Sequence, residues 1–165
     1  MIPLDNLNRI TEKMRELNAA DILTANEKTQ WEQVSENEKI EALKNIISYP
    51  VGRNLKHWFM FSWFVKTRWA EALKTVNLTA PASMLELATG SSTMLPQVLA
   101  KCYSHPNTRY TSINLNKKLT ADFKQNTKDL PLSIKVIEDA AQNIEEHFGE
   151  AKIDAVVFEH SFNDL

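Results

Sequence analysis

The stretch that most constrains this chain is SMLELATGSSTMLP, residues 83–96, in which an apolar run meets a turn of small residues and then a helical pattern. Glu86 stands at the end of the apolar run, and the small residues Ala88, Gly90 and Ser92 follow at alternate positions. Small residues let a backbone approach a ligand closely, and Gly90 can adopt a positive φ. The first N–H groups of the following helix have no helical partner and favour a negative group. The pattern is typical of a nucleotide-binding loop, with Glu86 as an acceptor for a cationic group.

Strand-like and helix-like patterns alternate throughout the second half of the chain. Apolar runs predict strands at residues 84–88, 109–115, 133–138 and 153–159. Helices are predicted between them, at residues 93–103, 118–127 and 140–148. Such alternation is typical of an α/β fold, in which right-handed crossovers give a doubly wound parallel sheet with helices on both faces. Ligands of such sheets bind at the carboxyl ends of the strands, so the residues that follow each strand are the candidate site.

The first part of the chain carries helical patterns only. We predict helices at residues 3–18, from the capping box at Ser35 to residue 48, and at residues 54–76, with a polar, mobile connection at 24–35. The third helix holds three of the four Trp residues, and one face carries Trp58, Phe61, Val65, Trp69, Leu73 and Val76. Aromatic residues at helical spacing indicate a buried helix, the lining of a cavity for an apolar substrate, or a protein interface. The predicted organisation is a helical cap at residues 1–78 and an α/β domain at residues 82–165.

Composition narrows the possible partners. The net charge is −2, which gives no electrostatic footprint for nucleic acid, and no apolar run is long enough to span a membrane. The single cysteine, Cys102, excludes an intramolecular disulfide, and the first residues lack the basic start and apolar core of a signal peptide. We therefore expect a cytoplasmic protein that binds neither nucleic acid nor membranes and holds no metal.

Polar residues follow each of the later strands. Asn114 follows the second strand and can hydrogen-bond a ribose, although an acidic residue usually does so in dinucleotide-binding folds. Asp139 follows the third strand and can accept a hydrogen bond from an exocyclic amine. His160 follows the fourth and can contact a substrate or act as a base, although a helix start with a cap at Asn163 or Asp164 explains much of the same composition.

Four segments, LELATGSS, YTSINLN, VIEDA and IDAVVFEHSFNDL, occur in this order and together resemble class I (Rossmann-like) S-adenosylmethionine-dependent methyltransferases. The first motif of that family is an acidic residue followed by three alternating glycines, and Glu86, Ala88, Gly90 and Ser92 fall on those positions. The resemblance covers residues 82–165. It implies a Rossmann-like doubly wound parallel sheet of which about four strands are present, preceded by an N-terminal helical cap.

The resemblance also implies roles for individual residues. The loop of Ala88, Thr89, Gly90 and Ser92 would hold the methionine part of S-adenosylmethionine, with Glu86 before it. Asn114 stands where the family has a ribose-binding acid, and Asp139 with Ala140 would meet the adenine. Glu159 and His160 would border the transferring methyl group, with His160 as the candidate catalytic base. The implied reaction methylates a small molecule and leaves S-adenosylhomocysteine.

Residues 153–159 read as a strand that is buried on both faces, yet only a few residues follow it. In the family, one more parallel strand and an antiparallel pair would come next. A free strand edge of this kind is a template for pairing. We therefore expect a missing C-terminal segment, or a second copy in a homo-oligomer, to cover this edge.

Two other functions compete with this interpretation. A nicotinamide-dependent oxidoreductase would need G-x-G-x-x-G, and Ala88, Gly90 and Thr93 supply one glycine at those three positions. A non-catalytic binding or interaction module could retain the methyltransferase fold without its chemistry. The neutral Asn114 and the short C-terminal half favour this second alternative.

Overall fold

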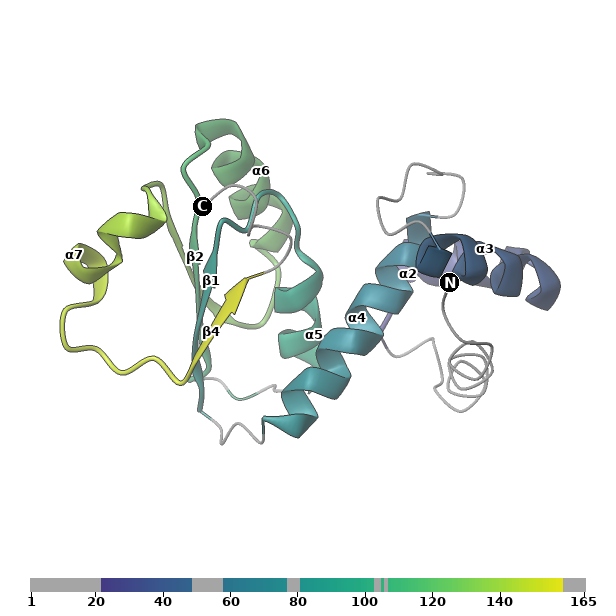
Figure 1. The fold of residues 1–165 in the computed structure, drawn as a ribbon, viewed down its shortest axis with the longest axis horizontal. Helices are drawn as coiled ribbons and strands as arrows, with labels where there is room; N and C mark the ends of the chain where they lie inside the picture. The colour runs from purple at the N-terminus through teal and green to yellow at the C-terminus, as the bar shows by residue number, and fades with distance from the viewer. Residues whose placement is uncertain (1–21, 49–57, 77–80, 103–104, 106, 159–165) are drawn as a thin grey trace. The chain divides into compact units, whose positions relative to one another are not determined.

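A computed structural model describes residues 22–48, 58–76, 81–102, 105 and 107–158 of the chain (Figure 1). The chain divides into two compact units, Met1–Trp69 and Ala70–Leu165, and the division falls inside helix α4, Trp58–Thr75. The predicted cap ends at residue 78 and the predicted α/β domain begins at residue 82, both beyond this division, and these limits stay a prediction.

The first unit contains helices α2 (Ala25–Gln33) and α3 (Glu36–Ser48) and most of α4. The predicted mobile connection at 24–35 is wrong, because α2 occupies most of it. Thr24 begins α2 with a capping box, since its hydroxyl accepts from the Glu27 N–H and Glu27 accepts from the Thr24 N–H. Ser35 and Glu38 form the same arrangement before α3, as predicted. The predicted helix at 3–18 lies outside the described residues.

Helix α4 buries a different face from the predicted one. Phe61, Val65 and Trp69 are only partly buried, and Val76 is exposed. The buried side chains are Phe59, Met60, Ser62, Trp63, Lys66, Thr67, Ala70 and Leu73. Of these, Phe59, Met60 and Trp63 form a core with Leu23, Ala42 and Leu43, and Trp31 lies with its ring 5.5 Å from that of Trp63. Two aromatic residues of α4, Phe59 and Trp63, are therefore core residues of this unit.

The second unit is a four-stranded sheet with helices between its strands. The strands are β1 (Ser83–Leu87), β2 (Arg109–Ile113), β3 (Ser133–Ile137) and β4 (Ala155–Phe158). The connecting helices are α5 (Met94–Cys102), α6 (Lys117–Thr127), the short 3-10 turn η3 (Ala141–Asn143) and α7 (Ile144–Phe148). All pairs are parallel, and the order is β3-β2-β1-β4.

This order and the crossover helices confirm the predicted α/β class. A Rossmann sheet has the order 3-2-1-4 in its first four strands, so the unit is a partial Rossmann-like sheet. Figure 1 shows α7 on one side of the sheet, with α5 and α6 on the other. On the α7 side, Leu85, Leu87, Ile113 and Ile137 pack with Ala141, Ile144, Phe148 and Ile153. On the other side, Tyr110 stacks on Phe123 of α6 with ring centroids 6.1 Å apart.

Strand β4 departs from the prediction of burial on both faces. Val157 is buried, but Val156 is 49% exposed and Phe158 is 37% exposed. Alternate residues of a strand point to opposite faces, so Val156 and Phe158 belong to one face that the described residues leave partly open.

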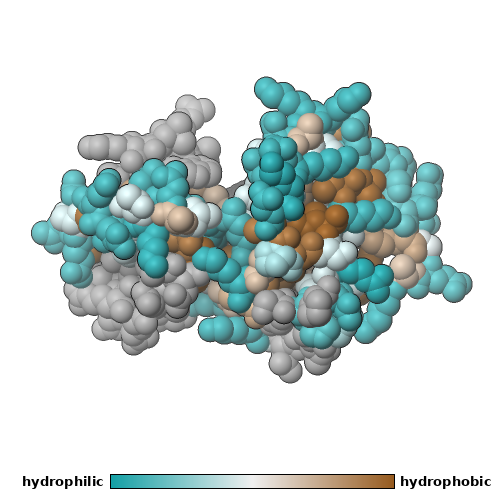
Figure 2. All heavy atoms as spheres, turned by 180° about the vertical axis from the view of Figure 1, so that it is seen from behind, coloured by the Kyte–Doolittle hydropathy of each residue, from teal (hydrophilic) through white to brown (hydrophobic). Residues whose placement is uncertain are grey.

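On the face that Figure 2 shows, most of the coloured residues are hydrophilic, and hydrophobic atoms gather in patches among them. No helix in the described part of the chain combines the length and the apolar character needed to cross a membrane.

Candidate functional site

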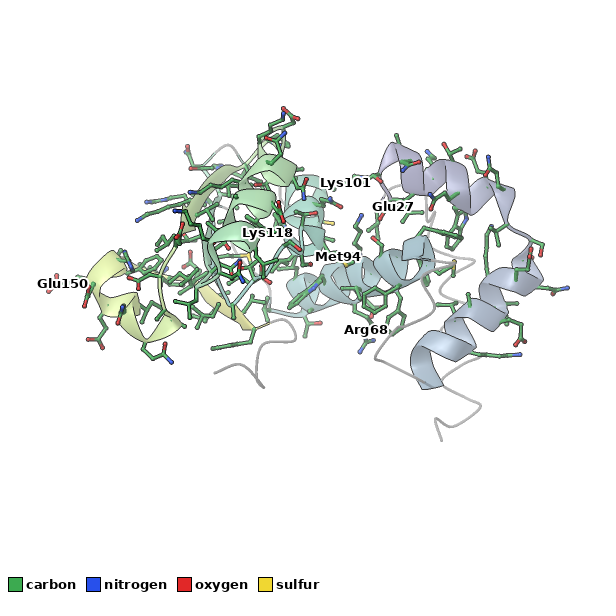
Figure 3. The ribbon with its side chains drawn as sticks, turned by 90° about the horizontal axis from the view of Figure 1, so that it is seen from above. Glu27, Arg68, Met94, Lys101, Lys118 and Glu150 are labelled. Carbon is green, nitrogen blue, oxygen red and sulfur yellow. The ribbon has the colours of Figure 1, made fainter. Side chains whose placement is uncertain are left out.

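The loop between β1 and α5 has an unusual backbone. Ala88 and Gly90 both have positive φ, 54° and 64°. This is the left-handed region, which Gly adopts freely and which strains other residues. A Cβ placed on Gly90 would have no atom within 4 Å. The loop therefore presents bare backbone to an open space just before α5, whose first residue, Met94, is labelled in Figure 3.

Strand β2 holds this loop through side-chain hydrogen bonds. The Asn114 amide donates to the carbonyl oxygen of Gly90 at 2.7 Å, and the Ser112 hydroxyl donates to Thr89 Oγ1 at 2.8 Å. The Ala88 N–H also donates to the carbonyl of Ile113 at 3.0 Å. Asn114 is 5% exposed, so its donor is committed to the loop in a largely buried position. The structure shows that Asn114 shapes the loop, and its predicted contact with a ribose stays a prediction.

Glu86 lies in β1, just before the loop. The residue is 1% exposed, and the Tyr110 hydroxyl donates to its Oε2. Leu85 and Ile113 lie on the α7 side of the sheet. Because successive residues of a strand point to opposite faces, Glu86 and Tyr110 project from the other side. The predicted acid is therefore held by Tyr110 inside the fold, and its contact with a cationic ligand group stays a prediction.

Asp139 follows β3 and is bound on both carboxylate oxygens by residues of its own segment. Oδ1 accepts from the Ala140 N–H at 2.7 Å and from the Asn143 amide at 2.8 Å. Oδ2 lies 2.7 Å from His147 Nε2. The hydrogen bonds with His147, Asn143 and the Ala140 N–H hold the pKa of Asp139 below its usual value. The carboxylate is thus ionised and oriented, and it remains partly exposed.

The predicted residues after β1, β2 and β3 lie along one edge of the sheet. Leu87 pairs with Ile113 and Ile113 with Ile137, so the carboxyl ends of these strands are neighbours. The residues that follow them are Ala88, Thr89, Gly90 and Ser92, then Asn114, then Asp139 and Ala140. Glu159 and His160 lie outside the described residues.

Sequence reasoning missed the residues that support this edge. Ser112 was hidden inside a predicted strand, although its neighbour Asn114 was recognised. Asn143 and His147 stand four and eight residues after Asp139, a helical spacing that could have indicated a shared face.

Comparison with known proteins gave a structural likeness only. No family profile matches the chain, and no curated protein sequence matches it. A solved structure that resembles it is the crystal structure of a SAM-dependent methyltransferase from Thiobacillus denitrificans in complex with S-adenosyl-L-homocysteine. The two are 22% identical, the alignment covers 56% of this chain and 36% of the other, and the TM-score is 0.42.

Proposed function

We propose that the edge formed by the carboxyl ends of β1, β2 and β3 binds S-adenosylmethionine, and that the chain supplies the cofactor-binding part of a small-molecule methyltransferase. The observation that most directly supports this proposal is the backbone conformation of the loop from Ala88 to Ser92. Its two positive φ angles, the open space beside Gly90 and the clamp from Asn114 make a preformed backbone cradle. A cradle of this kind suits a ligand that the backbone must approach closely.

The proposal gives a role to the 88–92 loop, to Asp139 and to Asn114. The backbone of the 88–92 loop would lie against the methionine portion of the cofactor, because Gly90 leaves no side chain in the way. Asp139 would accept a hydrogen bond from the adenine amine, since an ionised carboxylate with two oxygens has acceptor capacity beyond its present partners. Asn114 would act indirectly, by fixing the loop.

The cofactor supplies a methyl group on a sulfonium, which an acceptor displaces in line. Catalysis of such a displacement rests on alignment of the two reactants and exclusion of water. The described residues serve the alignment by holding the cofactor rigidly. In this proposal His160 takes a proton from an acceptor that arrives protonated, and residues 1–78 form the cap that selects the acceptor.

Calorimetric titration of the full chain with S-adenosylhomocysteine tests the proposal. We expect saturable binding that Gly90→Val abolishes, because the valine side chain would fill the space beside the loop. Gly149→Val is the matched control: Gly149 also has positive φ, 50°, and open space, but it follows α7 away from the loop. Asp139→Ala should weaken binding by about 1–3 kcal/mol.

Two results would separate the possible failures. Absence of binding to the folded chain, or full binding by Gly90→Val, would refute the cofactor site. Binding without methyl transfer to any acceptor in a panel of small molecules would instead support the non-catalytic binding module.

A further inference from the structure

The α7 side of the sheet is divided into an apolar half and a cationic half. Toward the carboxyl ends it carries Leu85, Leu87, Ile113 and Ile137. The same alternation places Ser83, Arg109, Thr111, Ser133 and Lys135 toward the amino ends. Covered faces of parallel sheets are normally apolar, whereas Arg109, Ser133 and Lys135 are exposed, so this half of the face is open to solvent. The amino half of this face is suited to a polar occupant.

A cavity lies over this cationic half. It measures about 480 Å³ and is lined by Ser83, Arg109, Thr111, Ser133, Lys135, His147, Phe148, Ala151 and Lys152. A second cavity of about 640 Å³ continues past the starts of the strands and shares Ser83, Arg109, Ser133 and Lys152 with the first. These volumes are those of a site for a small molecule.

The charges that line the cavity do not balance. Lys152 Nζ pairs with Asp154 Oδ1 at 2.8 Å, and the Ser83 N–H donates to Asp154 Oδ2 at 2.8 Å. These contacts raise the pKa of Lys152 and lower that of Asp154, so this pair is charged and mutually neutralised. His147 faces Asp139.

Arg109 and Lys135 also line the cavity. Among the described residues no carboxylate forms an ion pair with either of them, and the Lys135 ammonium lies 5.8 Å from the centre of the Phe148 ring. Two cations that line one hollow repel each other and attract a multivalent anion.

We propose that this cavity binds the phosphate group of a small molecule, at the opposite ends of the strands from the candidate cofactor site. The planar guanidinium of Arg109 can donate two parallel hydrogen bonds to phosphate oxygens, and Lys135 adds a point charge. The hydroxyls of Ser83, Thr111 and Ser133 supply further donors along the same face. Phosphate fits this donor-rich lining better than a carboxylate because it offers more acceptor oxygens. The site does not depend on the function proposed above.

Titration of the full chain with inorganic pyrophosphate at constant ionic strength tests this site. We expect saturable binding, weakened at least tenfold by Arg109→Gln and by Lys135→Gln, because each loses a charge-assisted contact. Lys118→Gln removes one charge from an exposed position in the first turn of α6 and should change binding less than about twofold (Figure 3). Amide chemical shifts of the unmodified chain should move at Arg109 and Ser133 and stay fixed at Gly90.

Several results would overturn the assignment. The assignment is wrong if the unmodified chain binds no pyrophosphate at millimolar concentration, or if Lys118→Gln weakens binding as much as Arg109→Gln does. Equal affinity for citrate and pyrophosphate would show a general anion site instead of a phosphate site. Shifts confined to Gly90 and its neighbours would show that pyrophosphate binds the candidate cofactor loop.

Discussion

The Asn114 side chain and the Gly90 carbonyl oxygen lie 2.7 Å apart, with the amide as donor. This hydrogen bond joins the end of β2 to the loop that follows β1. Its direction matters, because an aspartate at this position, the residue type that binds ribose in related folds, has no proton to donate when it is ionised. The position therefore requires an amide for the loop geometry of this chain.

Substitution of Asn114 should weaken both the fold and the candidate site. Asn114→Ala leaves the Gly90 carbonyl without its donor and should cost about 1–3 kcal/mol of unfolding free energy. Asn114→Asp should cost at least as much, because a carboxylate would face a carbonyl oxygen. Urea denaturation measures both, with Asn126→Asp at an exposed position of α6 as the control. Tighter cofactor binding by Asn114→Asp would contradict this interpretation.

The two positive-φ residues of the loop should respond oppositely to substitution. Ala88→Gly relieves the strain of a Cβ at φ 54°, and the greater freedom of glycine in the unfolded chain offsets part of the gain. We expect a net stabilisation of less than about 1 kcal/mol. Gly90→Ala introduces the same strain at φ 64° and should destabilise by about 1 kcal/mol, although a Cβ there meets no atom. Thermal unfolding of the two variants should shift in opposite directions; equal shifts would disprove the strain argument.

Asp139 should make stability depend on pH in the acidic range. Its pKa is lowered in the folded state, so its contribution is complete above the unfolded value of about 3.9 and is lost as the pH falls through the folded value. Asp139→Asn should therefore be less stable than the unmodified chain at pH 6, and the difference should shrink below about pH 4. Asp122→Asn, at an exposed position of α6, is the control. A difference that stays constant from pH 6 to acid would show that Asp139 does not act through its charge.

The ion pair of Lys66 and Glu27 should stabilise the helical unit more than an exposed pair does. Lys66 is fully buried and lies 2.8 Å from Glu27. Burial alone would raise the pKa of Glu27, but the contacts with Lys66 and the Thr24 N–H outweigh it and lower the pKa. Glu27→Gln should therefore cost about 2 kcal/mol or more.

The exposed pair of Lys44 and Glu41 provides the comparison for this prediction. Glu41→Gln should change stability by less than about 1 kcal/mol, because water screens the pair. Denaturation followed by tryptophan fluorescence reports on the helical unit, since Trp31 and Trp63 lie in its core. Equal effects of the two substitutions would show that burial of Lys66 adds nothing.

The sheet was predictable because its signals are local. Each strand begins or ends within two residues of its prediction, since apolar runs and turn residues mark it directly. Helix α2 was missed because its residues are polar and none is buried, although Thr24 and Glu27 form a capping box that the sequence displays. The buried face of α4 was misassigned because Lys66 interrupts the apolar pattern there, and its burial depends on Glu27, which is distant in the sequence.

The loop of the candidate site was predictable from the sequence, but its contacts were not. Small residues at 88, 90 and 92 mark the loop, and the structure gives Gly90 the expected positive φ. The roles of Asn114 and Glu86 could not be inferred, because their partners Gly90 and Tyr110 are each 24 residues away. Hydrogen bonds of this range follow from strand register, which residue types alone do not specify.

Strand β1 pairs with β2 on one side and with β4 on the other, and these partners appear at very different times as the chain is synthesised. The β2 side can close once residues 109–113 have left the ribosome. The β4 side must wait for Asp154, whose N–H donates to the Ser83 carbonyl at 2.8 Å, and for the strand that follows it. Until then one edge of β1 has unpaired N–H and C=O groups, which is a template for pairing with a strand of another chain.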